Sequence, residues 1–397
     1  MLEFISHGLL PALPWWGYLA LTFVTIHLTV VGVTVYYHRD QAHRALDLHP
    51  LLRGFFRFWV WSTTAMVVSE WVAVHRKHHA FVETENDPHS PQILGLRRML
   101  GAGAEVYSKA VEEPGIVAKY ARGTPDDRFE HFCARYKVAG VTVLGIIELA
   151  LFGAPGVAIW AAQMLAMPLL ASALVNGLGH HSGYRNFELP DASANVLPFG
   201  FIAGGEELHN NHHAFPSSAK FSLRPFEFDI GWCYIRALSA LGLARVRRTY
   251  PRPHFSPCAP STPSLDVEAL RAVVTNRMHV LRAYRREVLM PVLREELARR
   301  SRRRHFRRDR RLLMRDAKLL DEAALTRRKR LIARFPRLAA AWRYREGLRA
   351  IWEERAISNE GVLERLREWV ATAEKSDLTG LAEFAARLRT YRLPQTA

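Results

Sequence analysis

The stretch that decides the fold runs from Trp15 to His43 and reads WWGYLALTFVTIHLTVVGVTVYYHRDQAH. Residues 15–37 carry no charged side chain, and about 20 apolar residues are enough for one helix to cross a bilayer. No basic segment precedes this run, so we predict a retained membrane span and not a signal peptide. His38 and His43 follow where the apolar run ends, which predicts imidazoles at a membrane surface.

Two further apolar runs, residues 138–153 and 157–177, predict two more spans. The Gly-Ala-Pro-Gly sequence at 153–156 is a turn signal, so these runs should form a helical hairpin. A fourth apolar stretch, residues 54–74, contains Arg57 and Glu70 and lies between two histidine clusters. A single crossing there would put the clusters on opposite faces of the membrane, and we therefore predict an interfacial helix.

The distribution of basic residues sets the expected orientation. Lysine and arginine are absent from residues 1–37 and frequent between residues 39 and 98. The positive-inside rule then predicts an integral protein of the inner (cytoplasmic) membrane, with the histidine clusters and the C-terminal region in the cytosol. The three cysteines are widely spaced, which suits a reducing compartment and argues against a disulfide framework.

The net charge of +17 is spread unevenly along the chain. Residues 1–260 contain 22 Lys and Arg against 20 Asp and Glu, whereas residues 261–397 contain 33 against 18. Residues 251–263 hold five prolines and predict a linker, and residues 264–397 show helical composition with apolar periodicity. We therefore predict an all-α protein, with a membrane domain and its cytosolic helical cap over residues 1–250 and a basic helical tail over 264–397.

Four histidine clusters carry the chemistry. Imidazoles three or four residues apart share one face of a helix, as in His75, His78 and His79, whereas His38 and His43 are five apart, so one of them should lie just past a helix end. Imidazole suits Zn, Cu, Fe and Ni, and nine such ligands exceed what one ion can take, so the pattern predicts two metal ions. The cluster residues are His38, His43, His75, His78, His79, Asn176, His180, His209, His212 and His213.

Other metal chemistries fit less well. No carboxylate lies within the clusters at ligand spacing, and an HExxH motif is absent, which disfavours a carboxylate-bridged bundle site and a zinc protease. Isolated histidines such as His7, His131 and His254 are expected to be packing or surface groups. His89 and His181 adjoin the clusters, and the sequence leaves their role open.

At these residues the sequence resembles the membrane fatty-acyl desaturases, the family of stearoyl-CoA desaturase and its bacterial relatives. The likeness covers residues 15–250 and includes the runs ETENDPH at 83–89 and GEELHNNHHAFP at 205–216. It implies an oxidoreductase of unsaturated fatty acid biosynthesis, which uses O2 to make a cis double bond in a saturated acyl chain, with the delta-9 position expected.

The resemblance also implies the cofactor, two non-haem irons. One iron would take His38, His43, His75 and His212, with Asn176 acting through a water. The other would take His78, His79, His180, His209 and His213. Electrons would arrive singly from a donor such as ferredoxin, rubredoxin or cytochrome b5, and we expect a separate protein because no cytochrome b5-like segment is visible.

One departure from the family bears on the substrate. Acyl-CoA desaturases typically carry Arg-Asp before the second histidine box, where they hold the CoA head, and here the pair is Ala73-Val74. We therefore favour an acyl chain on phospholipid, with acyl-CoA as the second choice. From the depth expected along the first span, Thr22 and Ile26 are predicted to form the floor of the acyl tunnel.

The second ring nitrogen of a ligating histidine usually needs a partner of its own. The acidic residues nearest the clusters are candidates for that role, namely Asp40, Asp87, Glu206 and Glu207.

The tail carries nine arginines between Arg299 and Arg311, a run that suits phosphate groups. We expect anionic lipid or an acidic electron carrier as its partner and regard nucleic acid as a poorer fit. The alternative is a solvated helical face without a partner. We also expect the chemistry to survive loss of the tail, because no iron ligand is predicted there. Two rival functions stay open: a membrane di-iron hydroxylase or alkane monooxygenase, and a membrane-anchored nucleic-acid-binding regulator.

Overall fold

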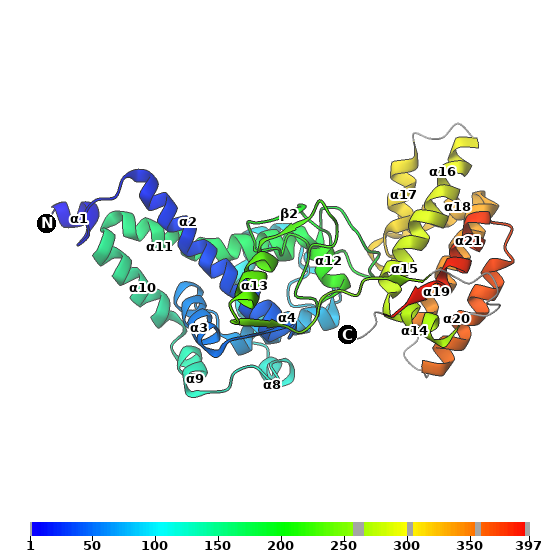
Figure 1. Ribbon diagram of the computed structural model, residues 1–397. Helices are drawn as coiled ribbons and strands as arrows, with labels where there is room; N and C mark the ends of the chain where they lie inside the picture. The colour runs from blue at the N-terminus through cyan, green and yellow to red at the C-terminus, as the bar shows by residue number, and fades with distance from the viewer. Residues whose placement is uncertain (1, 257–265, 300–304, 354–358, 394–397) are drawn as a thin grey trace. The chain divides into compact units, whose positions relative to one another are not determined.

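A computed structural model describes residues 2–256, 266–299, 305–353 and 359–393. The chain divides into two compact units (Figure 1). The N-terminal unit comprises Met1–Arg185 and Asp191–Tyr250, and the C-terminal unit comprises Asn186–Pro190 and Pro251–Ala397. From residue 257 onward, the predicted linker lies outside the described residues.

The N-terminal unit is built mainly from helices. Its helices are α1 (Leu2–His7), α2 (Trp15–Val31), η1 (Gly32–Ala42), α3 (Pro50–Thr64), α4 (Val68–Phe81), α5 (Pro91–Leu94), α6 (Leu96–Gly101), α7 (Gly103–Val111), α8 (Ile116–Tyr120), α9 (Arg128–Arg135), α10 (Lys137–Phe152), α11 (Ala154–Met167), η2 (Pro168–Gly177), η3 (Leu178–His180), α12 (His209–Ala214) and α13 (Ile230–Ala240). Two short strand pairs join distant segments, β1 (Leu46–Leu48) with β4 (Ala244–Val246) and β2 (Phe199–Gly200) with β3 (Phe228–Asp229).

Two helices in the described part of the chain are long and apolar enough to cross a membrane, by length and composition alone. They are Trp15–Ala42, with 28 residues, and Ala154–His180, with 27. Both begin as α-helices and continue as π-helices, η1 and η2. The predicted span at 138–153 corresponds to α10, whose 16 residues reach about 24 Å, less than the hydrocarbon thickness of about 30 Å.

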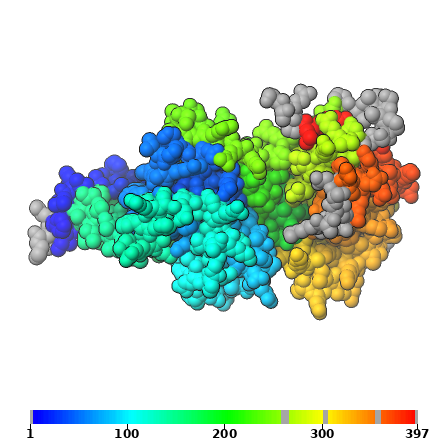
Figure 2. Space-filling view, turned by 90° about the horizontal axis from the view of Figure 1, so that it is seen from below, coloured from blue at the N-terminus to red at the C-terminus, as the bar shows by residue number. Residues whose placement is uncertain are grey.

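Helices α10 and α11 form the predicted hairpin. Gly153 joins them with a φ of +65°, and a Cβ there would lie 2.5 Å from the Ile5 carbonyl oxygen, so only glycine fits this close turn. Residues 2–14 lie against the hairpin (Figure 2), where the Leu9 amide donates to the Ala150 carbonyl at 2.9 Å. Ile146 and Leu165 are among the large apolar side chains that the hairpin leaves exposed, which is the surface a lipid-facing helix presents.

The predicted interfacial helix at 54–74 is two helices in the structure, α3 and α4. Helix α3 begins at Pro50, where the His49 side chain accepts from the Leu51 amide at 3.3 Å. It ends at Ala65, which adopts a left-handed φ of 60°, and the chain is extended at Val67 before α4 starts. The break turns the chain, so α4 has its own axis, and its last two turns carry the second histidine cluster.

The C-terminal unit is a helical bundle with one apolar core. Its elements are β5 (His254–Phe255), α14 (Val267–Thr275), α15 (Arg277–Tyr284), η4 (Arg285–Leu289), α16 (Met290–Arg299), α17 (Phe306–Met314), η6 (Ala317–Leu319), α18 (Glu322–Arg334), α19 (Pro336–Glu353), α20 (Asn359–Glu374), α21 (Thr379–Leu388) and β6 (Tyr391–Arg392). Strand β5 pairs with β6, so the first and last described segments of residues 251–397 are joined. The core includes Tyr284, Trp369 and Phe384 packed edge to face.

Candidate metal centre

Four segments of the N-terminal unit bring the clustered histidines together. They are the end of η1, the last turns of α4, the short helix η3 and helix α12. The π-helix explains the unusual spacing of the first cluster. The His43 amide donates to the His38 carbonyl at 3.0 Å, so residues five apart stand above one another. His43 is the residue that caps the helix end, as expected from the spacing.

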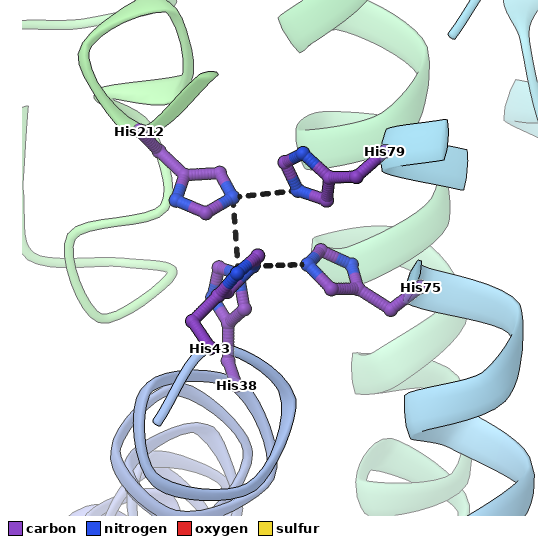
Figure 3. A group of neighbouring side chains, drawn as sticks. All are labelled: His38, His43, His75, His79 and His212. Carbon is purple, nitrogen blue, oxygen red and sulfur yellow. Dashed lines mark hydrogen bonds between the residues drawn. The ribbon is translucent and has the colours of Figure 1, made fainter. Parts of the chain in front are cut away.

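The first group contains His38, His43, His75, His79 and His212 (Figure 3). Their Nε2 atoms face one another. The separations are 3.2 Å from His38 to His212, 2.8 Å from His43 to His75, and 2.9 Å from His79 to His212. Three different segments of chain therefore direct ring nitrogens into one small space.

The second group contains His78, His180, His209 and His213. The Nε2 atom of His209 lies 2.9 Å from that of His180 and 3.2 Å from that of His213. The His78 Nε2 atom is buried and has no hydrogen-bond partner within the described residues. A buried nitrogen without a partner costs free energy unless it has a ligand, and this one lies beside three other imidazoles.

These distances fit metal coordination. Two imidazole nitrogens bound to one ion at about 2.1 Å, at right angles to each other, lie about 3.0 Å apart. Burial holds the pKa of His75, His209 and His212 well below the usual range, and neighbouring imidazoles lower it further. The rings are therefore neutral at physiological pH, which is the form that binds a metal.

The structure groups the histidines differently from the ligand division that the resemblance implied, and the ligand assignment itself stays a prediction. His79 lies in the first group, with His212, and not in the second. The reason is helical geometry, because His75 and His79 stand one turn apart on α4 whereas His78 is rotated towards His180. The His79 ring also stacks on His213 at 4.6 Å between centroids, so it lies at the boundary of the two groups.

Four carboxylates contact the outer nitrogens of the histidines. Two of the candidates named from the sequence are among them: Glu206 lies 2.8 Å from Nδ1 of His38, and Asp87 lies 2.9 Å from Nδ1 of His78. Burial alone would raise the pKa of Asp87, but the adjacent His78 holds it well below its usual range. Such contacts fix the ring orientation and the tautomer.

Sequence reasoning missed the other two carboxylates. Glu83 lies 2.9 Å from Nδ1 of His180, and Asp191 lies 3.3 Å from Nδ1 of His213. Glu83 adopts a left-handed φ of 60°, an uncommon backbone conformation for glutamate that concentrates at functional sites. Glu83 lies in the ETENDPH run beside Asp87, and that proximity was the only signal available.

The remaining two candidates have other partners. The Asp40 carboxylate binds Arg53, with both contacts at 2.7 Å. Glu207 accepts the backbone amides of Ala203 at 2.8 Å and Gly205 at 3.2 Å and so shapes the loop before α12. Neither carboxylate contacts a clustered histidine among the interactions of the described residues.

Arg39 supports two histidines of the first group through the Phe221 ring. Its side chain is fully buried and pairs with Asp229 at 3.0 Å. Its guanidinium lies 3.8 Å from the centre of the Phe221 ring, which in turn packs against His38 and His212. The buried Arg39–Asp229 ion pair therefore holds the Phe221 ring against the imidazoles of His38 and His212.

A cavity of about 490 Å³ adjoins the histidines. Asn176 lines it together with His38, His75 and His209. The predicted tunnel residues Thr22 and Ile26 are not among the residues that line the cavity. The apolar wall of the cavity begins one turn after Ile26 on the same helix and includes Val30, Val33, Trp71, Val74, Met164 and Met167.

The two undecided histidines differ. His89 is buried, stacks on His78 at 4.4 Å and lines the cavity. Burial lowers its pKa to about 3, with a further contribution from His78. His181 is exposed, and its Nδ1 lies 2.7 Å from the Ser182 hydroxyl. Within the described residues, His89 joins His78 and Asp87 in a third candidate ligand group, and His181 joins none.

Comparison with known proteins identifies the family of this chain. The family model of fatty acid desaturases matches residues 13–256, and this chain belongs to that family. The sn-1 stearoyl-lipid 9-desaturase of Synechocystis is 33% identical over 58% of this chain and 71% of its own length. The Delta-9 acyl-lipid desaturase 1 of Arabidopsis thaliana is 30% identical over 58% and 74%, and the icosanoyl-CoA 5-desaturase of Limnanthes douglasii 29% over 60% and 68%.

A second family model, described as a transposase, matches residues 270–394. This part of the chain is the helical bundle of the C-terminal unit. The match covers under a third of the chain, so it does not assign the chain to that family.

Proposed function

We propose that this chain is an O2-dependent di-iron desaturase that introduces a cis double bond into a saturated fatty-acyl chain. The observation that carries the proposal is the pair of histidine groups, with ring nitrogens 2.8 to 3.2 Å apart, beside an apolar cavity. Family membership gives the reaction class.

The ligand assignment follows the two groups. His38, His43, His75, His79 and His212 would hold one iron, and His78, His180, His209 and His213 the other. Asn176 lines the cavity and would act through a water. When bound, the irons supply the oxidising power that side chains lack, because abstraction of hydrogen from an unactivated methylene lies beyond general acid–base chemistry.

The overall reaction balances without a further reactant besides an electron donor. Two hydrogens leave adjacent methylenes, two electrons come from the donor and two protons from solvent, and O2 becomes two waters. The protein's own task is to present one methylene pair to the histidine groups and to exclude water. Val33, Trp71 and Met167 line the cavity and would enclose the chain.

Phospholipid is the acyl carrier we favour. Ala73 and Val74 are fully buried and pack against Ala110 and Ile116, so at this position no charged group meets a CoA head. Two relatives are named as acyl-lipid desaturases and one as acting on an acyl-CoA. The delta-9 position is carried over from the names of the two acyl-lipid enzymes.

The membrane topology is part of the proposal. Trp15–Ala42 and Ala154–His180 would cross the cytoplasmic membrane, with α10 inserted beside them as the shorter arm of the hairpin. The histidine groups and the C-terminal unit would face the cytosol, where a one-electron donor such as ferredoxin or rubredoxin is available. An N-terminal side without lysine or arginine up to residue 37 supports this orientation.

The C-terminal unit would contact phosphate groups of anionic lipid through a basic face. We define the α17–α18 basic face as the exposed basic side chains of these two helices: Arg307, Arg308, Arg310, Arg311, Arg327, Lys329, Arg330 and Arg334. The arginines at 300 and 302–304 that the sequence singled out lie outside the described residues.

The test is product analysis. The full chain should be expressed in a bacterium that lacks its own desaturase, with phospholipid and acyl-CoA pools analysed separately. A cis monoene, found first in the phospholipid pool, is the expected result. A hydroxylated acyl chain or an alcohol in place of the olefin would instead establish the hydroxylase alternative.

A further inference from the structure

One short loop within the residues that match the desaturase family belongs structurally to the C-terminal unit. Asn186–Pro190 groups with Pro251–Ala397, although the residues before and after it, Arg185 and Asp191, belong to the N-terminal unit. The loop lies in the chain between the ligand His180 and Asp191, the carboxylate that contacts His213.

Glu188 is held in the C-terminal unit by a buried ion pair. Two guanidinium nitrogens of Arg345 lie 3.0 and 2.5 Å from one carboxylate oxygen of Glu188, and Arg285 lies 3.6 Å from the other oxygen. The two paired side chains are only 5% and 8% exposed, so loss of either partner would leave a buried charge with only a secondary contact, Glu346 for Arg345 and Arg285 for Glu188. The face of Trp342 covers the Arg345 guanidinium at 4.6 Å.

The neighbouring residue adds an apolar contact. Phe187 is 1% exposed and packs edge-on against the His279 ring at 5.5 Å between centroids. Arg282 lies above the same phenyl ring at 6.0 Å. The loop is therefore held by an ion pair of Glu188 and by the packing of Phe187. The partners of both side chains, Arg345 and His279, lie on helices of the C-terminal unit.

The chain on the two sides of the loop is held together, and the residues that follow the loop contact the metal centre. Tyr184 and Asn195 exchange two backbone hydrogen bonds, of 2.9 and 2.7 Å, which close the neck of the excursion. The Ala192 amide donates to Glu83 at 2.9 Å, and Glu83 in turn contacts His180. The Asp191–His213 contact, at 3.3 Å, is the longest of the four carboxylate–histidine contacts.

We propose that Glu188, held by Arg345, is a positioning residue for the metal centre. The C-terminal unit fixes the loop, and the loop fixes the Asp191 carboxylate at His213. Asp191 depends on this more than the other carboxylates do, because its contact is the longest and it directly follows the loop. This inference rests on the proposed function and contradicts the expectation that the chemistry survives loss of the tail.

The experiment compares point variants of the full chain in membranes. Glu188→Gln, Arg345→Met and the double variant remove the ion pair, Arg345→Lys keeps its charge, and Asp191→Asn removes the final contact without changing the C-terminal unit. Arg337→Gln is the matched control, because it removes an exposed ion pair with Glu295 in the same unit. The measurements are kcat and KM for the acyl substrate, iron per chain, and tryptic cleavage after Arg185.

Loss of a carboxylate that orients a metal-bound histidine typically costs about 10-fold or more in activity or metal affinity. We expect Glu188→Gln, Arg345→Met and Asp191→Asn each to lower kcat about 10-fold with little change in KM, and to lower the iron content. Only the first two should speed cleavage after Arg185. The double variant should be no worse than either single variant, and Arg345→Lys should recover part of the activity.

Two results would overturn the proposal. One is an ion-pair variant that speeds cleavage at Arg185 but keeps the kcat and iron content of Arg337→Gln. The other is full activity and iron content in Asp191→Asn, which does not depend on how the C-terminal unit folds. Failure of the wild-type chain to make an olefin would instead count against the proposed function, and iron content with proteolysis would still test the loop.

Discussion

The two units of this chain bury different kinds of group. Around the histidines, the N-terminal unit encloses imidazoles, carboxylates and the guanidinium of Arg39. The C-terminal unit encloses an apolar core of leucine, valine and aromatic side chains, and carries most of its charge on the surface, with the Glu188–Arg345 ion pair as a buried exception. Burial of polar groups costs free energy unless each one has a partner. The N-terminal unit bears that cost where it would bind metal, whereas the C-terminal unit buries mainly apolar side chains.

This contrast predicts how each unit should respond to mutation. Changes at the histidines should abolish activity with little effect on the C-terminal bundle. Changes on the surface of the bundle should affect association and leave the metal centre intact. The loop at Asn186–Pro190 is the exception, because it joins the bundle to the metal centre.

Loss of a clustered imidazole should produce the largest difference in response between the two units. Alanine in place of any of the nine histidines should reduce desaturation to background and lower the iron content, because an incomplete ligand set no longer holds its ion. Hydrogen exchange of amides in the C-terminal core should not change. Gas chromatography of cellular fatty acids, together with metal analysis of the purified protein, measures both effects.

Histidines outside the clusters provide the control. His7, His131 and His254 belong to none of the histidine groups, and their alanine variants should keep wild-type activity and two irons per chain. A single zinc ion per chain, together with full activity in His180→Ala, would contradict the di-iron proposal.

The clustering of the histidines could be predicted from the sequence because their spacing along a helix is a local property. Histidines three and four residues apart on α4 and α12 share a helical face wherever the helix lies. The grouping of His79 with His212 depends on where separate segments pack, and the sequence does not contain that information locally. The same holds for Asp191, which reaches His213 only because the intervening chain folds back.

Backbone irregularity limited the prediction of the fold. The break at Ala65 has no proline or glycine beside it, so the sequence gives no turn signal there. The π-helices η1 and η2 likewise have no composition signal, although they set the register of His38 and Asn176. Gly153 shows the contrary case, because the Gly-Ala-Pro-Gly sequence predicted a turn there and the glycine adopts a positive φ.

Neutralising part of the α17–α18 basic face tests the C-terminal unit alone. Arginine near an anionic membrane contributes about 1 kcal/mol per residue. Replacing Arg307, Arg308, Arg310 and Arg311 with glutamine should therefore weaken binding of the full chain, in neutral nanodiscs, to anionic vesicles by about 4 kcal/mol, which is about 1,000-fold. Activity with an artificial donor should not change.

The matched control replaces the same four residues with lysine, which keeps the charge and should keep most of the binding. Added salt should weaken the binding of the wild-type chain to anionic vesicles, as the glutamine substitutions do. Unchanged vesicle binding with slower turnover by reduced ferredoxin would assign the face to the electron donor. Retention of duplex DNA by the wild-type chain alone would favour nucleic acid, in line with the transposase match.

Acid should weaken the C-terminal unit through His279. Burial lowers the pKa of His279 to about 4, below the unfolded value of about 6.5. The folded unit then binds fewer protons than the unfolded chain between these two values, so stability is complete above pH 6.5 and falls as the pH drops towards 4. We expect a loss of about 2 kcal/mol by pH 5, measured by hydrogen exchange of core amides after correction for intrinsic rates. His279→Gln should remove most of this pH dependence.

The smallest expected effect distinguishes two positions on one helix. Val33 lines the cavity, whereas Ile26, the position that the sequence favoured for the tunnel floor, does not. A tryptophan at Val33 should shorten the space for the acyl chain, and one or two methylenes in an apolar pocket are worth about 1.5 kcal/mol, or about tenfold in selectivity. Competition between acyl chains of different length should therefore shift towards the shorter substrate in Val33→Trp. The double bond should keep its position from the carboxyl end if the variant acts on the methyl end of the chain.

Ile26→Trp should leave the ratio of products unchanged, since Ile26 does not line the cavity. A shift in Ile26→Trp without one in Val33→Trp would mean that the acyl chain enters between other helices than those that enclose the cavity.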